Sequence, residues 1–457
     1  MRTWNTIRGT LLGCFGALGS LSSLAPDAEA AQIKKIYRGT TSFDSTDVVQ
    51  SVAIGGTVDL SKSVLLITSN IAATTADQRL LFMGQFEDTQ TIQVSRAGSG
   101  STASATWQVV EFEDGVLVYR GISSMQPGDL TKSITLPASI DTTKAVPIIF
   151  NQAADTARSR TEQYFLSATF PNATTLKLDR LSVTTNSRGV TITWQVVQFL
   201  TDATVYTGQV GFPLGAPTTN QTITNDGLDP DGAGALPTNA GAFSPALSNG
   251  GANALLFFYV NAGNPAATGA ANASANVGRD AQFFVRGTIT NATTLTFVRG
   301  YADTAANTQA NVRYYVVDFT DGTAHGLGQK GSVAHNTTDP TITITSSTDT
   351  TPISVTATAH GLSTGQLVSI NGHTTNTNAN GSWVVTVTGV DTLTLDGSSA
   401  TSAGPGLGGT IRAAVNTALA ATPAFRADRT VTLQSVSGGT TTTDSWADDL
   451  SFVGHLT

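Results

Sequence analysis

The stretch FMGQFEDTQTIQVSR at 82–96 decides the fold because it occurs three times at equal length. The other two copies are LSATFPNATTLKLDR at 166–180 and VRGTITNATTLTFVR at 285–299. A second shared block follows each copy: WQVVEF at 107–112, WQVVQF at 194–199 and YYVVDF at 314–319. The chain is therefore predicted to be an array of three copies of one structural unit.

Each copy has the pattern of β-strands. Apolar residues alternate with polar ones at Ile92 and Val94, which is the period of a half-buried strand. The sequence Asn-Ala-Thr-Thr at 172–175 and again at 291–294 is typical of a hairpin turn. The block at 107–112 is apolar on both faces, as expected of a central strand that is covered twice. We therefore expect small antiparallel sandwiches of about five strands each.

The predicted fold class is all-β: tandem antiparallel β-sandwich repeats with a small β-barrel module near the C-terminus. The predicted parts are a signal peptide at 1–30, β-sandwich repeats at 31–128, 129–213 and 252–339, a Gly/Pro/Asn-rich loop or linker at 214–251, a small β-barrel module at 340–412, and a short helix with C-terminal strands at 413–457. The last segment either completes the third repeat or forms a partial fourth unit.

The N-terminus has the layout of a secretory signal peptide. Arg2 and Arg8 precede an apolar run at 10–25, and the small residues Ala28-Glu29-Ala30 follow it. The run is shorter than the roughly 20 residues that span a bilayer, so we expect export and no membrane span in the mature chain. A lipoprotein box at Leu12-Gly13-Cys14 and a retained N-terminal helix are the alternatives.

Composition excludes disulfides from the processed chain. Cys14 is the only cysteine, so a chain processed at residue 30 has no disulfide and depends on packing for its stability.

The charge of the chain limits its partners. The net charge is −8, only 12% of residues are charged, and basic residues are not clustered. Nucleic acid is therefore not expected as a partner.

One polar constellation recurs in every copy. An arginine ends the first shared stretch, and a hydrogen-bond acceptor lies near the end of the second block, on the face that carries its aromatic residue. We expect the arginine and the acceptor to touch and to pin two strands of the sandwich, because a part-buried guanidinium needs an acceptor. The alternative is a polar cluster that holds a sugar hydroxyl beside a stacking aromatic ring. The pairs are Arg96 with Glu111, Arg180 with Gln198 and Arg299 with Asp318, and the aromatic residues are Trp107, Trp194 and Tyr314.

Motifs for catalysis and for metal binding are weak. Asp229 and Asp231 lie in an acidic loop that resembles a calcium loop, but a Gly stands where its first carboxylate should be and no Glu closes it. The five histidines lack ligand spacing. We expect no enzyme and no cofactor. The alternatives are Ca²⁺ bound at this loop and a glycosidase pair of carboxylates from distant strands.

The repeat resembles H-type lectin domains, through its apolar lead strand, hairpin and closing W-x-V-V strand over residues 50–331. Those domains are six-stranded sandwiches that associate as trimers and bind amino sugars. The resemblance implies a homotrimer and glycan binding, but no sugar-contacting residue is carried over.

Residues 340–412 resemble a different module. AHGLSTG at 359–365, NANGSW at 378–383 and TLTLDG at 392–397 follow one another at the spacing of a small β-barrel common in phage tail and virion structural proteins. The module is also similar to the small β-barrel inserted in ubiquitin-activating enzymes. The resemblance implies a spacer or docking domain and no activity.

Three functions follow as hypotheses. The first is an exported, non-enzymatic structural or adhesion protein, displayed on a cell surface or assembled into a fibre, for which apolar strands on two faces favour self-association. The second is a phage tail or fibre component of a virion. The third is a secreted glycan-binding lectin.

Overall fold

The computed structural model describes residues 31–71, 81–99, 103–153, 164–181, 189–212, 221–223, 246–263, 285–299, 309–319, 341–400 and 404–413. The all-β class is confirmed: the described residues form antiparallel strands and short 3-10 turns, without an α-helix. In these ranges no helix is long and apolar enough to cross a membrane. The predicted signal peptide, the loop with Asp229 and Asp231, and the segment after Ala413 lie outside the described residues.

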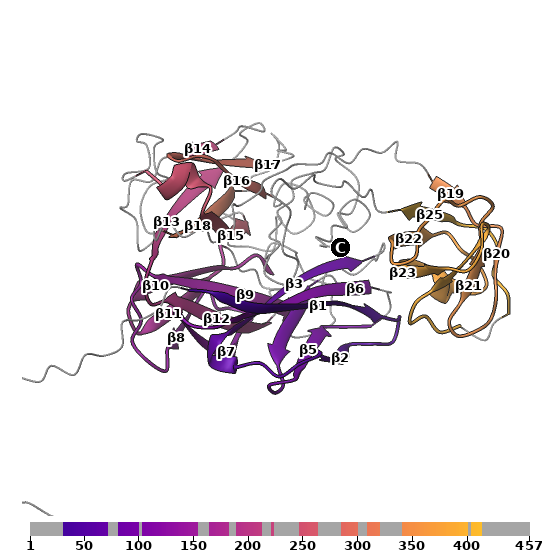
Figure 1. Ribbon diagram of the computed structural model, residues 1–457, viewed down its shortest axis with the longest axis horizontal. Helices are drawn as coiled ribbons and strands as arrows, with labels where there is room; N and C mark the ends of the chain where they lie inside the picture. Colours follow the sequence, from indigo (N-terminus) through magenta and orange to yellow (C-terminus); the bar gives the residue numbers. More distant parts are fainter. Residues whose placement is uncertain are drawn as a thin grey trace, which may run out of the picture.

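The first unit consists of six strands in two sheets (Figure 1). They are β1 (Ile33–Phe43), β2 (Val49–Ala53), β3 (Ser63–Ile71), β4 (Phe82–Phe86), β5 (Thr91–Arg96) and β6 (Ala103–Phe112). One sheet has the order β1-β6-β3 and the other the order β2-β5-β4. The sheet formed by the first, sixth and third strands therefore packs against the sheet formed by the second, fifth and fourth strands.

The next two units repeat this topology. The second has β7 (Val116–Met125), β8 (Thr131–Thr135), β9 (Ala145–Ala153), β10 (Ser167–Asn172), β11 (Thr175–Asp179) and β12 (Val190–Phe199), in sheets β7-β12-β9 and β10-β11-β8. The third has β13 (Ala203–Phe212), β14 (Gln221–Ile223), β15 (Ala254–Gly263), β16 (Val285–Asn291), β17 (Thr294–Arg299) and β18 (Gln309–Phe319), in sheets β13-β18-β15 and β14-β17-β16. Each unit therefore has six strands, one more than the sequence predicts.

The additional strand is the first of each unit. β7 lies inside the predicted first repeat, 31–128, but it pairs along its whole length with β12. In the same way β13 lies inside the predicted second repeat, 129–213, and pairs with β18. The strand pairing therefore starts the second and third units at residues 116 and 203.

A glycine in each first strand makes room for the aromatic residue of the sixth. Gly39 pairs with Trp107, and Gly121 pairs with Trp194. A Cβ atom on Gly39 would lie 2.4 Å from Cζ2 of Trp107. Only glycine allows the indole to lie flat across the neighbouring strand, and the ring in turn covers the backbone that glycine leaves bare.

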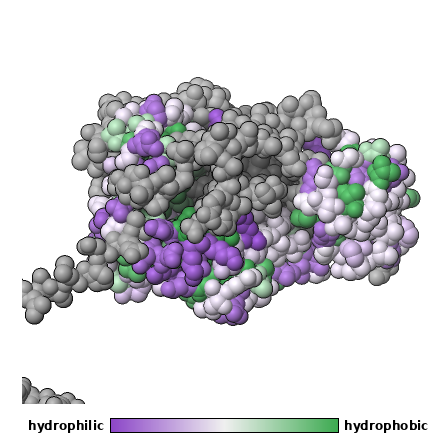
Figure 2. All heavy atoms as spheres, in the orientation of Figure 1, coloured by the Kyte–Doolittle hydropathy of each residue, from purple (hydrophilic) through white to green (hydrophobic). Residues whose placement is uncertain are grey.

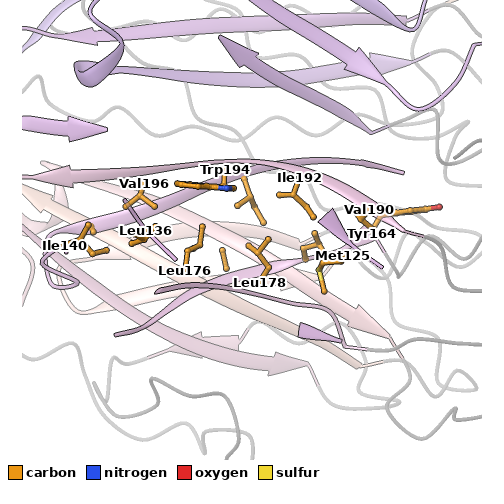
Figure 3. Close-up of a cluster of buried hydrophobic side chains, with 14 of the residues drawn as sticks. Met125, Leu136, Ile140, Tyr164, Leu176, Leu178, Val190, Ile192, Trp194 and Val196 are labelled. Carbon is orange, nitrogen blue, oxygen red and sulfur yellow. The ribbon is translucent and has the colours of Figure 1, made fainter. Parts of the chain in front are cut away.

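Each unit has its own hydrophobic core between its two sheets. In the second unit, Trp194 and Val196 of β12 face Leu176 and Leu178 of β11 (Figure 3). The residues that open the three sequence copies, Phe82, Leu166 and Val285, are buried in the cores of their own units, 6%, 4% and 3% exposed. These equivalent surroundings confirm that one β unit occurs three times.

A further core joins the units. Val110, Val197 and Val317 occupy the same position of the sixth strands and point away from their own sandwiches into this shared core. Phe199 and Phe319 meet there edge to face, with ring centroids 5.4 Å apart. The strands are covered on both faces, as their composition predicts.

The shared core also affects the prediction of self-association. That prediction uses the second apolar face of the repeats, and the structure buries this face inside one chain. The face is therefore not available to another copy, so it does not support a homotrimer or a fibre.

The C-terminal module is a seven-stranded sheet of order β19-β25-β22-β23-β24-β21-β20, curled around the fully buried Trp383. Its strands are β19 (Thr341–Thr343), β20 (Ser346–Ser347), β21 (Ser354–Thr356), β22 (Leu367–Asn371), β23 (Gly381–Val387), β24 (Thr392–Leu395) and β25 (Thr410–Ala413). Leu407 bridges to both Ser346 and Thr374. The module lies against the first unit, where Ser45 Oγ donates to Asn378 Oδ1 at 3.4 Å.

Two histidines of this module, His360 and His373, are buried. His373 is 2% exposed, with Nδ1 2.5 Å from Gly408 O and Nε2 2.8 Å from Ser347 Oγ. His360 Nδ1 accepts from Leu362 N at 3.0 Å. His373 joins its loop to β20, and His360 stabilises its own loop, so both rings have a structural role.

Candidate functional site

The recurring arginines hold a turn. Arg96 closes β5 and is 2% exposed; its Nε donates to Asp47 O at 2.8 Å and its Nη2 to Asp44 O at 2.7 Å. Arg180 directly follows β11 and is 3% exposed; its Nε donates to Asp129 O and its Nη2 to Gln126 O, both at 2.5 Å. In both units the guanidinium thus grips the turn between the first and second strands.

Main-chain contacts complete this grip. Arg96 N donates to Val48 O and Arg180 N donates to Leu130 O, each at 2.9 Å. Burial lowers the pKa of Arg180, and the carbonyl oxygens around it replace the water that burial removes. We name this arrangement the arginine clamp; it consists of Arg96 with the turn 44–48 and Arg180 with the turn 126–130.

Replacing Arg180 with methionine is expected to lower the free energy of unfolding by about 1–3 kcal/mol, because the turn carbonyls lose a charged donor. Limited proteolysis should then cut at 126–130 in the folded protein. Arg412→Met is the matched control, since Arg412 is exposed on the barrel. Equal resistance of both variants to the protease would contradict the clamp.

The predicted contact between Arg96 and Glu111 is not formed. Glu111 Oε1 accepts instead from Lys34 Nζ at 2.9 Å and from Asp59 N at 3.1 Å. The connection from β5 to β6 is short, so Arg96 lies near Ala103, at the start of β6. Glu111 is eight residues further along the strand, roughly 26 Å away.

Of the other two predicted pairs, one has the same geometry, and the other contains a side chain outside the described residues. Arg180 and Gln198 lie at opposite ends of their unit in the same way, and Gln198 Oε1 has no hydrogen-bond partner. The side chain of Arg299 lies outside the described residues. Its predicted partner Asp318 accepts from Ser248 N at 2.9 Å. In the first two units the arginine and the acceptor are therefore two separate features.

The acceptor position differs between units in how its charge is balanced. Glu111 is 1% exposed, and a β-bulge in β1 at Ile33/Lys35 adds Lys34, whose ammonium pairs with it. The hydrogen bond to Glu111 raises the pKa of Lys34. The second unit has the neutral Gln198 here, and the third has Asp318, again 1% exposed.

Each of these side chains has one buried oxygen without a partner: Glu111 Oε2, Gln198 Oε1 and Asp318 Oδ1. Within the described ranges, no three His, Cys, Asp or Glu side chains converge to hold a metal ion. Among the residues that the structure describes, each acceptor therefore stands at the end of its sandwich without a metal-binding set around it.

The aromatic residues proposed for sugar stacking are core residues. Trp107, Trp194 and Tyr314 are 4%, 6% and 2% exposed. One side of each ring lies over the glycine of the first strand, and the other belongs to the core of the unit. None of the three has a ring face at the surface, so these residues cannot stack on a glycan in the folded protein.

A repeated aspartate turn precedes the third strand in two units. Asp59 accepts from Ser61 N at 2.8 Å, and Asp141 accepts from Thr143 N at 2.9 Å. The side-chain hydrogen bond from Thr143 holds the pKa of Asp141 below its ordinary value, and Ser61 does the same for Asp59. In both turns the aspartate satisfies a nearby backbone N–H and so fixes the chain just before the third strand of its unit.

These aspartates predict a loss of stability in acid. Since its pKa is lower in the folded chain, Asp141 stabilises the fold above the unfolded pKa of about 3.9, and this contribution is lost as pH falls through the folded value. Asp141→Asn is expected to make unfolding, followed by circular dichroism, less dependent on pH below about 4. Glu113→Gln is the control, because the exposed Glu113 side chain accepts no hydrogen bond from a described residue; an equal change in both variants would exclude the turn as the cause.

The seam between the first two units contains polar residues that the sequence does not single out. The Gln195 side chain, 5% exposed, accepts from Leu65 N at 3.0 Å and donates to Leu65 O at 2.8 Å. Arg120 donates to Leu60 O and, at 2.6 Å, to Ser63 O. Its guanidinium stacks on Phe86, and burial lowers its pKa to about 10.

The seam between the second and third units uses tyrosines. Tyr259 donates its hydroxyl to Pro147 O at 2.5 Å, and Tyr315 donates to Ala168 O at 2.8 Å. Burial raises the pKa of both phenols. Pro147 stands where the first unit has Leu65 and has no N–H to satisfy, so the amide used at the first seam is not needed here.

Taken together, the polar residues that recur are engaged in turns, strand ends and seams between units. Comparison of the chain with family models, with curated proteins and with solved structures finds no match.

Proposed function

We propose that the chain is an exported, non-enzymatic structural or adhesion protein in which three β-sandwiches form one rigid block and a small barrel is attached to it. The observation that supports this most is the shared core, because it joins equivalent faces of three units into one body. A body of this kind resists separation of its parts, which suits a load-bearing or display role outside the cell.

The surface and the N-terminus agree with this role. Charged residues make up 12% of the chain. The barrel residues visible in Figure 2 are mostly pale, which marks intermediate hydropathy. Ala31, the residue after the proposed cleavage site, is 4% exposed and belongs to the shared core.

Mass spectrometry of the mature protein, combined with cell fractionation, tests the proposal. We expect a chain that starts at Ala31 and is recovered outside the cytoplasm. An unprocessed chain that stays in the cytoplasm would overturn export, and with it this function.

The second candidate is a structural component of a virion, either a tail or a fibre protein. The barrel motifs favour it, and the contact of Ser45 with Asn378 suits a docking module. Recovery of the chain from purified particles, together with an intact residue 1–30 segment, would favour this candidate over the first. A lectin remains the third candidate; it would have to use residues other than the three buried aromatics, and silence on a broad glycan array would exclude it.

A further inference from the structure

The sequence contains three Asn-Gly pairs, at 249–250, 371–372 and 380–381, and the structure describes all of them. Asparagine before glycine is the pair most prone to lose its side-chain amide, because glycine has no Cβ to hinder its own nitrogen from approaching the asparagine. The surroundings of the three asparagines differ in a way that separates reactive from protected sites.

Asn380 is held by its side chain at both ends. Its Nδ2 donates to His373 O at 2.8 Å and to Thr377 O at 3.2 Å. Its Oδ1 accepts from His373 N at 2.8 Å. The amide therefore cannot turn toward Gly381 without breaking these bonds.

Asn371 has the opposite environment. It is the last residue of β22, its side chain is exposed, and it makes no hydrogen bond to a described residue. Gly372 is also exposed and has a φ of 73°, so the chain leaves the strand directly after Asn371. Nothing described holds this amide away from the next backbone nitrogen.

We propose that Asn371-Gly372 is a site of spontaneous deamidation in the folded protein, and that Asn380-Gly381 is protected. The Gly372 nitrogen attacks Cγ of Asn371 and loses its proton to solvent. The bond from Cγ to the side-chain nitrogen breaks, and ammonia leaves. Water then opens the cyclic imide at either carbonyl, which yields aspartate or isoaspartate; no oxidant or reductant is needed.

The product alters the end of β22. It adds one negative charge to a chain of net charge −8. Isoaspartate also lengthens the backbone by one atom at the residue that pairs with Thr410 of β25. The modification therefore affects the edge of the barrel at which β22 and β25 end their pairing.

The test is peptide mapping by mass spectrometry after the folded full chain has been kept in mildly alkaline buffer. We expect the Asn371 peptide to gain about 1 Da, and to do so roughly tenfold or more faster than the Asn380 peptide, whose amide is bonded three times. Asn249 is exposed, with only a long contact of 3.5 Å to Asn253 Oδ1, and should also react faster than Asn380.

The same chain in concentrated urea is the control. There both asparagines should react at similar rates, since both precede glycine and neither is held. Asn371→Gln should abolish the change at 371 in both conditions. Equal rates at Asn371 and Asn380 in the folded chain, with both reacting in urea, would overturn the proposal.

Discussion

Trp194→Ala is expected to lower the free energy of unfolding by about 3–5 kcal/mol, the range for removing a large aromatic residue from a packed core. The indole is 6% exposed and packs in the core of the second unit. Loss of the ring also leaves a gap over Gly121, where the strand has no side chain to fill it. Urea unfolding followed by circular dichroism measures the loss.

The control separates packing from ligand binding. Trp194→Phe keeps an aromatic ring over Gly121, and we expect it to recover part of the lost stability. If Trp194 served a glycan instead, alanine would weaken binding and leave unfolding unchanged. An unfolding curve that does not move in the alanine variant would therefore contradict the core assignment.

Sequence reasoning predicts well those features that a local pattern specifies. The alternation at Ile92 and Val94 places both residues in the core, where they are fully buried. The aromatic and valine positions of the sixth strand place it in the centre of a sheet, as observed for β6, β12 and β18. These predictions hold because strand period and burial follow directly from residue type.

The local pattern does not assign the first strand of each unit to the correct sheet, and the reason is physical. β7 follows β6 after three residues, yet it pairs with β12. Local period says that 116–125 is a strand but not which sheet it joins. A signal did exist: Tyr-Arg-Gly at 37–39 and 119–121, and Tyr-Thr-Gly at 206–208, mark the three first strands. Their glycines are the positions that pair with the aromatic residues of the sixth strands.

The partners of the arginines were harder to predict. The sequence predicts side-chain acceptors for Arg96 and Arg180, but both donate to main-chain carbonyls of a turn. A carbonyl is present at every residue, so the sequence does not mark it as a partner. Chain geometry does exclude Glu111, because the short connection from β5 to β6 places Arg96 at the far end of that strand.

Gln195→Leu is expected to lower the free energy of unfolding by about 2–6 kcal/mol, because leucine leaves both Leu65 N–H and Leu65 C=O buried without a partner, at about 1–3 kcal/mol for each. Leu65 is fully buried, so water cannot replace the lost amide. β3 is an edge strand of its sheet, and the Gln195 amide satisfies backbone groups that a further strand would otherwise pair.

Calorimetry measures both the loss and its location. Because Gln195 belongs to the second unit and Leu65 to the first, we expect the variant to separate the unfolding of these units into two transitions. Gln90→Leu is the matched control: Gln90 is exposed on the first unit and bonds only to groups of that unit, so its replacement should change stability by less than about 0.5 kcal/mol. Destabilisation within a single, undivided transition would mean that Arg120 and the shared core alone hold the two units together.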